Sequence, residues 1–182
     1  VTGATGKVGQ AFIRRFLAER GDGTLRAFCH NRMLESTDRL EVVRGNLANR
    51  ADIDTAMEEI THILHLATCK ETPEDVIDVT VKGLFWLLEN CRQNPSFQQF
   101  LMVGGDAAVG HFVYPHPEPV TEQQKHMSYQ RCHALSKVLE EQQKFCVAKE
   151  SEVDERIDRA TLPEHIGVLD RDDLMAPRLV LR

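Results

Sequence analysis

Three glycines near the start of the chain constrain its fold more than any other feature. Residues 2–9 read Thr-Gly-Ala-Thr-Gly-Lys-Val-Gly, so the glycines fall at every third position. Gly3 permits a tight turn, Gly6 leaves room for a phosphate, and Gly9 allows a helix to pack closely on a strand. Apolar side chains then recur at helical spacing up to Arg20, and the N-terminus of such a helix attracts phosphate. The pattern predicts a dinucleotide-binding loop, with an ordinary glycine-rich turn as the alternative.

A loop of this kind follows the first, central strand of a parallel sheet. Here only Val1 precedes Thr2, whereas a strand usually has about five residues. We therefore expect these 182 residues to be part of a longer natural chain.

The remaining sequence alternates between patterns typical of strands and of helices. Strands are expected at 24–29, 40–44, 63–67 and 100–103, and helices at 7–20, 51–60, 75–93 and about 128–150. This order predicts an α/β fold, a Rossmann-like doubly wound parallel sheet with flanking helices and right-handed crossovers.

Composition narrows the classes of partner. A formal net charge of −6 argues against nucleic acid. No apolar stretch approaches the roughly 18 residues of a membrane span, so no membrane partner is expected. The five cysteines include no C-x-x-C pair, which indicates reduced thiols and a cytoplasmic location; they are residues 29, 69, 91, 132 and 146. No metal site is expected, because the eight histidines form no ligand motif.

Five motifs, in this order along the chain, resemble the extended short-chain dehydrogenases/reductases, the group of NAD(P)-dependent epimerases and dehydratases. The motifs are T-G-A-T-G-K-V-G at 2–9, G-N-L at 45–47, I-L-H-L-A at 63–67, D-V-T-V-K-G at 78–83 and L-S-K-V-L-E-E at 135–141. The resemblance covers about residues 1–145. It implies hydride transfer between NAD(P) and a carbonyl or sugar-nucleotide-like small molecule.

The resemblance also implies where the cofactor lies. The glycine loop takes the pyrophosphate, Asn46 contacts adenine, and the H-L-A segment runs beside the nicotinamide ribose. Asn46 stands where the family usually has Asp, and an amide can also bond to an adenine edge. The cofactor-binding residues implied in this way are Gly3, Thr5, Gly6, Lys7, Val8, Gly9, Asn46, Leu47, Leu66, Ala67, Thr68 and Lys137.

The catalytic positions depart from the family pattern. The family has a Tyr and, four residues later, a Lys on one helix; here Lys137 fits, but His133 replaces the Tyr. Asp106 replaces the Ser or Thr after the preceding strand. His133 could exchange protons near neutral pH, or be too short and leave the site inert, or have no role. Asp106 could serve in proton transfer, or only form a loop.

The choice between the two cofactors depends on the end of the second expected strand. An acidic residue there would bind the 2′-hydroxyl of NAD, and a basic one the 2′-phosphate of NADP. The chain offers His30, Asn31 and Arg32, with no carboxylate before Glu35. Arg32 either clamps the phosphate or is an ordinary surface residue, so NADP is modestly favoured over NAD.

Family members place a substrate lobe of more than a hundred residues after the Lys helix. We assign residues 1–150 to the dinucleotide-binding domain and 151–182 to a remnant or fragment of that lobe, which is reduced or incompletely given. Two functions stay open: an oxidoreductase or epimerase-type enzyme with an altered proton relay, or a non-catalytic dinucleotide-binding sensor or assembly protein. The substrate is unknown, and a homodimer is one assembly that we consider.

Overall fold

The computed structural model describes residues 1–68, 72–115, 121 and 124–148. Its strands are β1 (Leu25–Cys29), β2 (Leu40–Arg44), β3 (His62–His65) and β4 (Gln99–Met102). Its helices are α1 (Lys7–Ala18), α2 (Arg50–Ala56), α3 (Pro73–Asp75), α4 (Gly83–Gln93) and α5 (Cys132–Ala148), with a π-helix, η1 (Val76–Lys82), and a 3-10 turn, η2 (Asp106–Ala108). The expected domain segment 151–182 lies outside the described residues.

The four strands form two parallel pairs, β1 with β2 and β3 with β4. Val1 and Thr2 lie between the pairs and join them. On one side, Phe28 N–H donates to Val1 O at 2.9 Å; on the other, Thr2 N–H donates to Leu64 O at 3.0 Å. The bridge from Thr2 to His65 is parallel. The resulting order, β2, β1, Val1–Thr2, β3, β4, is that of a doubly wound nucleotide-binding sheet, as the sequence predicts.

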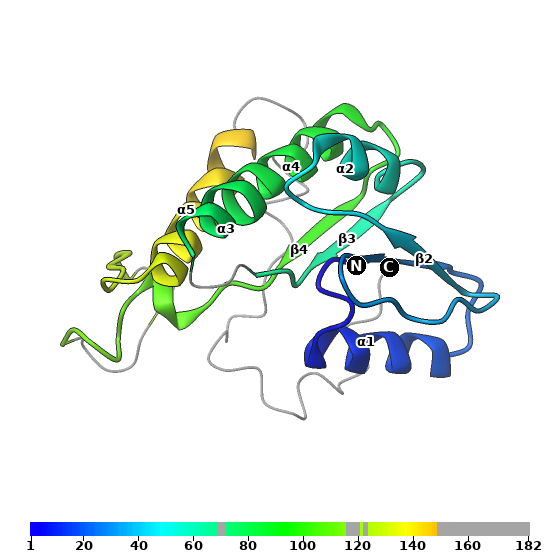
Figure 1. The fold of residues 1–182 in the computed structure, drawn as a ribbon, viewed down its shortest axis with the longest axis horizontal. Helices are drawn as coiled ribbons and strands as arrows, with labels where there is room; N and C mark the ends of the chain where they lie inside the picture. The colour runs from blue at the N-terminus through cyan, green and yellow to red at the C-terminus, as the bar shows by residue number, and fades with distance from the viewer. Residues whose placement is uncertain (69–71, 116–120, 122–123, 149–182) are drawn as a thin grey trace.

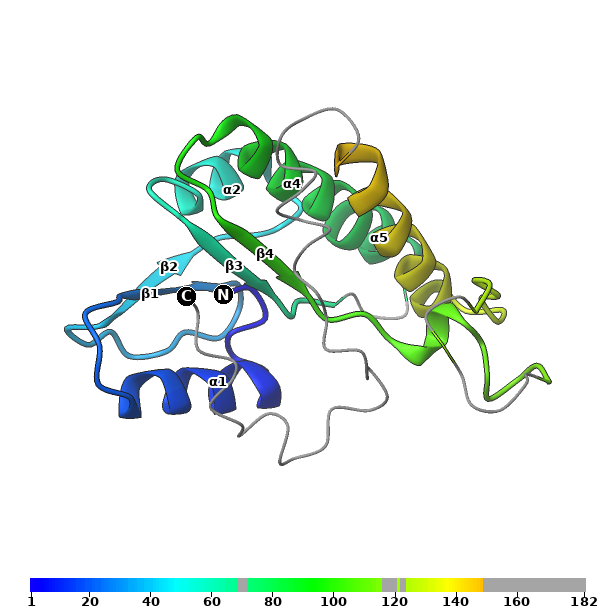
Figure 2. The same ribbon diagram turned by 180° about the vertical axis from the view of Figure 1, so that it is seen from behind.

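Helices cover both faces of this sheet (Figures 1 and 2). Helix α1 lies on one face, and α2, α4 and α5 lie on the other. Each face has its own core. The α1 face buries Ala4, Ile13, Leu25, Ala27, Cys29 and Leu40; the other face buries Leu47, Ile53, Met57, Ile63, Leu84, Leu87, Leu88, Cys91, Phe97 and Phe100.

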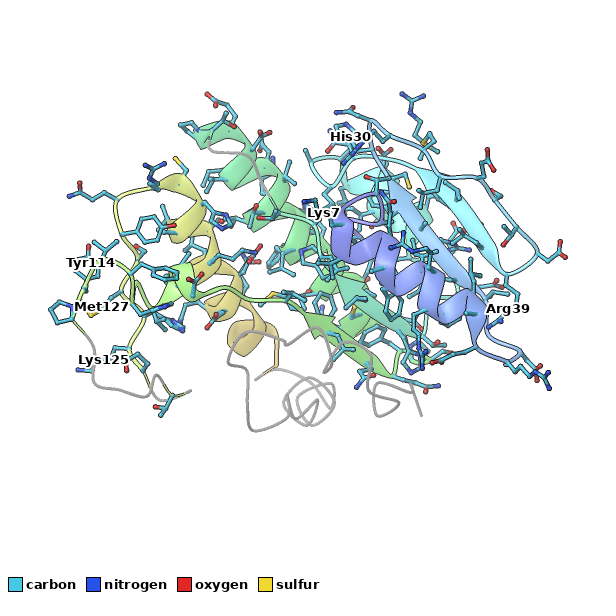
Figure 3. The ribbon with its side chains drawn as sticks, turned by 90° about the horizontal axis from the view of Figure 1, so that it is seen from below. Lys7, His30, Arg39, Tyr114, Lys125 and Met127 are labelled. Atoms are coloured by element: carbon cyan, nitrogen blue, oxygen red, sulfur yellow. The ribbon has the colours of Figure 1, made fainter. Side chains whose placement is uncertain are left out.

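Helix α1 ends beside Arg39, which lies at that end of the helix in Figure 3. The Arg39 guanidinium donates to Glu19 O at 2.8 Å and to Gly23 O at 3.0 Å. Its carbon atom Cζ lies 5.1 Å from the centre of the Phe16 ring. These contacts satisfy carbonyl groups that the end of a helix leaves without partners.

Two helices differ from the sequence expectation. The helix expected over 75–93 is continuous, but its first part is the π-helix η1, where α5 packs against it. The helix expected from about 128 begins at Cys132. Its start is later because Met127 N–H donates to Ala108 O at 2.8 Å, which ties residue 127 to η2 instead.

In the described part of the chain, no helix has the length and apolar character that a bilayer crossing requires.

Candidate functional site

The glycine loop is held against the end of β3. Gly3 has φ +66°, and a Cβ atom placed on it would lie 2.6 Å from the carbonyl carbon of Leu66. Only glycine combines this backbone conformation with so close an approach. The loop therefore touches Leu66 and Ala67, the two residues that the sequence assigned to the nicotinamide side of the cofactor.

The other two glycines have different tasks. A Cβ on Gly9 would lie 2.5 Å from Gly3 O and 2.8 Å from the Cα of Ala4, so Gly9 lets α1 pack on the loop. A Cβ on Gly6 would approach only Gly3 O, at 3.1 Å. Gly6 is the N-cap residue of α1, and it has no side chain that could accept a hydrogen bond from the first N–H groups of the helix. The first N–H groups of α1 therefore face an open position in front of the helix, where an anion is stabilised.

Lys7 begins α1 and is exposed, and Val8 beside it is 47% exposed. In Figure 3, Lys7 lies at the start of α1, and His30, which follows β1, lies on the same side of the molecule. Tyr114 and Met127 lie far from both, in the segments between β4 and α5. Because Phe28 N–H donates to Val1 O, the end of β1 lies beside the residue from which the chain enters the phosphate loop.

The Thr2 hydroxyl connects the loop to β3. Its oxygen lies 3.2 Å from the amide nitrogens of Leu66 and Ala67, and 2.9 Å from Nδ1 of His65. Since both amides donate, the hydroxyl proton points to Nδ1, and His65 carries its own proton on Nε2. Burial, with the charge of Lys137 acting in the same direction, lowers the pKa of His65 to about 3. His65 is therefore a neutral structural residue.

The adenine side is built by the G-N-L motif. Asn46 Oδ1 accepts from Ala48 N–H at 2.9 Å, and Asn46 N–H donates to Asp52 Oδ2 at 2.8 Å. Asp52 Oδ1 also accepts from Asn49 Nδ2 at 3.1 Å. In the described residues the Nδ2 group of Asn46 makes no hydrogen bond, so it can bond to an adenine edge. Leu47 is buried beneath it, against Gly83.

Arg32 lies in the loop after β1 and is exposed. Its guanidinium makes no hydrogen bond or ion pair with any residue that the structure describes. Its charge is therefore available to a ligand at this edge.

On α5, Lys137 and Glu140 form a buried ion pair. The distance between Nζ and Oε2 is 2.7 Å, and the two side chains are 8% and 0% exposed. Gly105, just after β4, lies beside the Lys137 stem, with a Cβ position 3.7 Å from Lys137 Cγ. Burial raises the pKa of Glu140, while the Lys137 ammonium acts against this shift.

His133 lies one turn before Lys137 and is half-buried. Its Nδ1 is 3.5 Å from the Thr68 hydroxyl, which follows the H-L-A segment. This contact brings the start of α5 to the carboxyl end of β3, as the sequence expects for residues of one cleft. Asp106 lies on η2 with a side chain that is 50% exposed, and its Oδ2 is 3.9 Å from Nδ1 of His111.

The structure therefore groups the candidate residues around one edge of the sheet. The contacts above link the glycine loop to Leu66 and Ala67, and Thr68 to His133, while Lys137 lies one helical turn beyond His133 on α5. Asp106 is connected only through its neighbour Gly105. The described residues contain no group of three or more His, Cys, Asp or Glu side chains that could hold a metal ion.

Two residues that contact site residues were missed from the sequence. Asp52 could have been noticed as a carboxylate in the first turn of a helix after the G-N-L motif. Glu140 follows Lys137 at a spacing that places both on one face of a helix.

Comparison with known proteins identifies the family and supports the fold. The chain belongs to the NAD-dependent epimerase/dehydratase family, whose model matches residues 1–160. The resemblance stated from the motifs is thereby confirmed. No curated protein sequence matches the chain.

Solved structures share the fold. Uronate dehydrogenase from Agrobacterium tumefaciens is 19% identical, with a TM-score of 0.71 over 82% of this chain and 55% of that one. A short-chain dehydrogenase/reductase superfamily protein from the same organism, with bound NAD, is 24% identical, with a TM-score of 0.68 over 82% and 44%. Bordetella bronchiseptica WbmH, in complex with NAD+, is 20% identical, with a TM-score of 0.67 over 80% and 51%. The chain spans about half the length of these proteins.

Proposed function

We propose that the chain binds an NAD(P) dinucleotide along the edge formed by the glycine loop, Asn46 and the residues after β3. The observation that carries this proposal is the preformed loop from Gly3 to Gly9. It places Gly3 beside Leu66 and Ala67, and it leads into α1 at Gly6, where no side chain caps the first N–H groups of the helix. In this arrangement, the loop would hold the pyrophosphate, Asn46 the adenine and Lys137 the nicotinamide ribose. The cofactor would supply hydride transfer.

The proposal is tested at Gly6, where an added Cβ comes close to one atom, Gly3 O at 3.1 Å, a contact that a shift of a few tenths of an ångström relieves. Its backbone is extended, with φ −73° and ψ 168°, a conformation that valine adopts readily. We expect Gly6→Val to fold and to lose dinucleotide binding in calorimetry, because its side chain fills the position of the phosphate. Gly21→Val is the matched control, since the nearest atom to its Cβ position is 4.0 Å away. Equal affinity of the Gly6→Val and Gly21→Val proteins would refute the assignment.

We further propose a modest preference for NADP through Arg32. A charge-assisted contact to the 2′-phosphate contributes about 1.5–3 kcal/mol when fully formed and less when the guanidinium only approaches it. Arg32→Ala should therefore weaken NADP binding and leave NAD binding unchanged. Arg20→Ala, which removes the same charge beyond the other end of α1, is the control. Tighter binding of NAD than of NADP in the wild-type protein, unaffected by Arg32→Ala, would contradict this preference.

We propose that the reaction is hydride transfer to or from a carbonyl or sugar-nucleotide-like substrate, with His133 in place of the usual tyrosine. Lys137 would orient the ribose, and the half-buried imidazole of His133 would exchange the proton. Asp106 would take part only if its exposed carboxylate turned toward Gly105. A panel of carbonyl compounds, sugar nucleotides and uronic acids, followed by nicotinamide absorbance, tests this reaction.

The non-catalytic alternative from the sequence is not favoured, because the family is one of epimerases and dehydratases and the structural neighbours include uronate dehydrogenase. If no compound of the panel is oxidised or reduced while the cofactor still binds, the non-catalytic alternative is favoured again.

A further inference from the structure

The buried ion pair on α5 is a feature that the proposed dinucleotide site does not by itself require. Glu140 lies one helical turn beyond Lys137, fully buried, and its Oε2 accepts from Nζ at 2.7 Å. Its other oxygen, Oε1, is buried and has no hydrogen-bond partner among the described residues. A carboxylate in such a position is costly unless an opposite charge lies beside it. Lys137 is that charge.

The ammonium of Lys137 has three N–H groups. Among the described residues, Glu140 is the one group that accepts a hydrogen bond from this ammonium. The aliphatic part of the Lys137 side chain packs against Gly105, which follows β4, and its ammonium group donates to Glu140. A long flexible side chain is thus held in one place, with N–H groups left for a ligand.

The charge of Lys137 acts at the end of β3. It contributes to the lowered pKa of His65, the residue directly before Leu66. Leu66 is where the proposed nicotinamide side of the cofactor begins. An uncompensated ammonium here would repel a second positive charge. When Glu140 is ionised, its negative charge offsets the positive charge of the Lys137 ammonium at hydrogen-bond distance. The pair is then neutral overall, and its electric field falls off steeply with distance.

We propose that Glu140 is a positioning residue that fixes Lys137 and compensates its charge, and that it thereby sets how strongly the site prefers oxidised over reduced cofactor. This proposal rests on the dinucleotide site proposed above. The nicotinamide ring of NAD+ is a cation, whereas that of NADH is neutral. Compensation at Lys137 therefore favours NAD+, and loss of the carboxylate charge disfavours it.

The test is the ratio of the two dissociation constants, measured without turnover. NAD+ and NADH are titrated by calorimetry into the wild-type protein, Glu140→Gln, and the double variant Lys137→Met with Glu140→Gln. In Glu140→Gln, the ratio of the NAD+ constant to the NADH constant should rise about three- to tenfold. In the double variant it should return to the wild-type value, although both affinities fall, because the pair of side chains is neutral again. Glu58→Gln, the same change of charge at an exposed position after α2, is the control.

The return in the double variant separates charge compensation from packing. A residue that only supported the helix would weaken both cofactors together, and adding Lys137→Met would not restore their ratio. If Glu140→Gln does not fold, the double variant decides, because a ratio different from that of the wild type overturns the proposal. An unchanged ratio in folded Glu140→Gln also overturns it, while the dinucleotide site stands. A wild-type protein that binds neither NAD+ nor NADH overturns both.

Discussion

The neutral, buried His65 makes the protein sensitive to mild acid. His65 is 2% exposed, and its Nδ1 already accepts a hydrogen bond from the Thr2 hydroxyl. Protonation would place a second positive charge near Lys137 and would break this hydrogen bond. In the unfolded chain, the same imidazole is free to take up a proton at its ordinary pKa of 6.5.

The size of the effect follows from linkage between proton binding and folding. Because burial lowers the folded-state pKa of His65 to about 3, its contribution to stability is complete above pH 6.5 and is lost as the pH falls below that value. In this range the unfolded state binds one more proton than the folded state. The free energy of unfolding should then fall by about 1.4 kcal/mol per pH unit, or roughly 2 kcal/mol between pH 6.5 and pH 5.

Urea unfolding at several pH values between 7.5 and 5 measures this slope. In His65→Asn, the amide oxygen can take the place of Nδ1 as acceptor for Thr2, and no group titrates in this range at that position. We expect the variant to be less stable at pH 7.5, because its side chain is smaller, but to lose less stability on acidification. His30→Asn, at an exposed position, should keep the wild-type slope. Parallel pH dependence of the wild-type and His65→Asn proteins would show that the reasoning about His65 is wrong.

Three further predictions concern the glycine loop, the adenine side and the proton relay. Gly9→Ala should destabilise the fold by about 1–3 kcal/mol, because its Cβ meets backbone atoms that cannot move aside. An unfolding temperature equal to that of the wild-type protein would contradict this prediction. Asp52→Ala should cost about 1–3 kcal/mol in urea unfolding, since the Asn46 amide loses its acceptor, and an unchanged midpoint would exclude that role. For any substrate found, His133→Tyr combined with Asp106→Ser should raise turnover if the natural site is inert, or move the pH optimum upward if His133 is the donor. A rate and pH profile untouched by His133→Ala would remove His133 from the chemistry.

The features predicted from the sequence are those fixed by nearby residues. The glycines at 3, 6 and 9 act through local backbone geometry, so their spacing alone indicates both the turn and the close approach of α1. The order of strands and helices follows from short apolar periodicities, and the parallel sheet follows from that order. Lys137 lies on a helix, α5, as the sequence predicts, whereas the roles expected for Asn46 and Lys137 come from the family resemblance.

The features that were missed depend on contacts between distant segments. The start of α5 is set by the bond from Met127 to Ala108, which no helical periodicity reveals. Burial of Glu140 depends on how α5 packs against η1 and η2, so the sequence does not single this residue out. The Thr2 hydroxyl meets Leu66 and Ala67 more than sixty positions away, a pairing that only the assembled sheet creates.

The π-helix η1 also bears on how this chain tolerates changes in length. Each hydrogen-bonded ring of a π-helix encloses one residue more than a ring of an α-helix. The seven residues from Val76 to Lys82 therefore hold an extra residue between the N-terminus of α3 and the buried leucines of α4. Deleting the exposed Ile77 would let this stretch close into an ordinary α-helix while Leu84, Leu87 and Leu88 keep their places. A deletion within α4 itself would instead rotate every later side chain away from the core. Length variation in this helix is thus confined to the turn that faces α5.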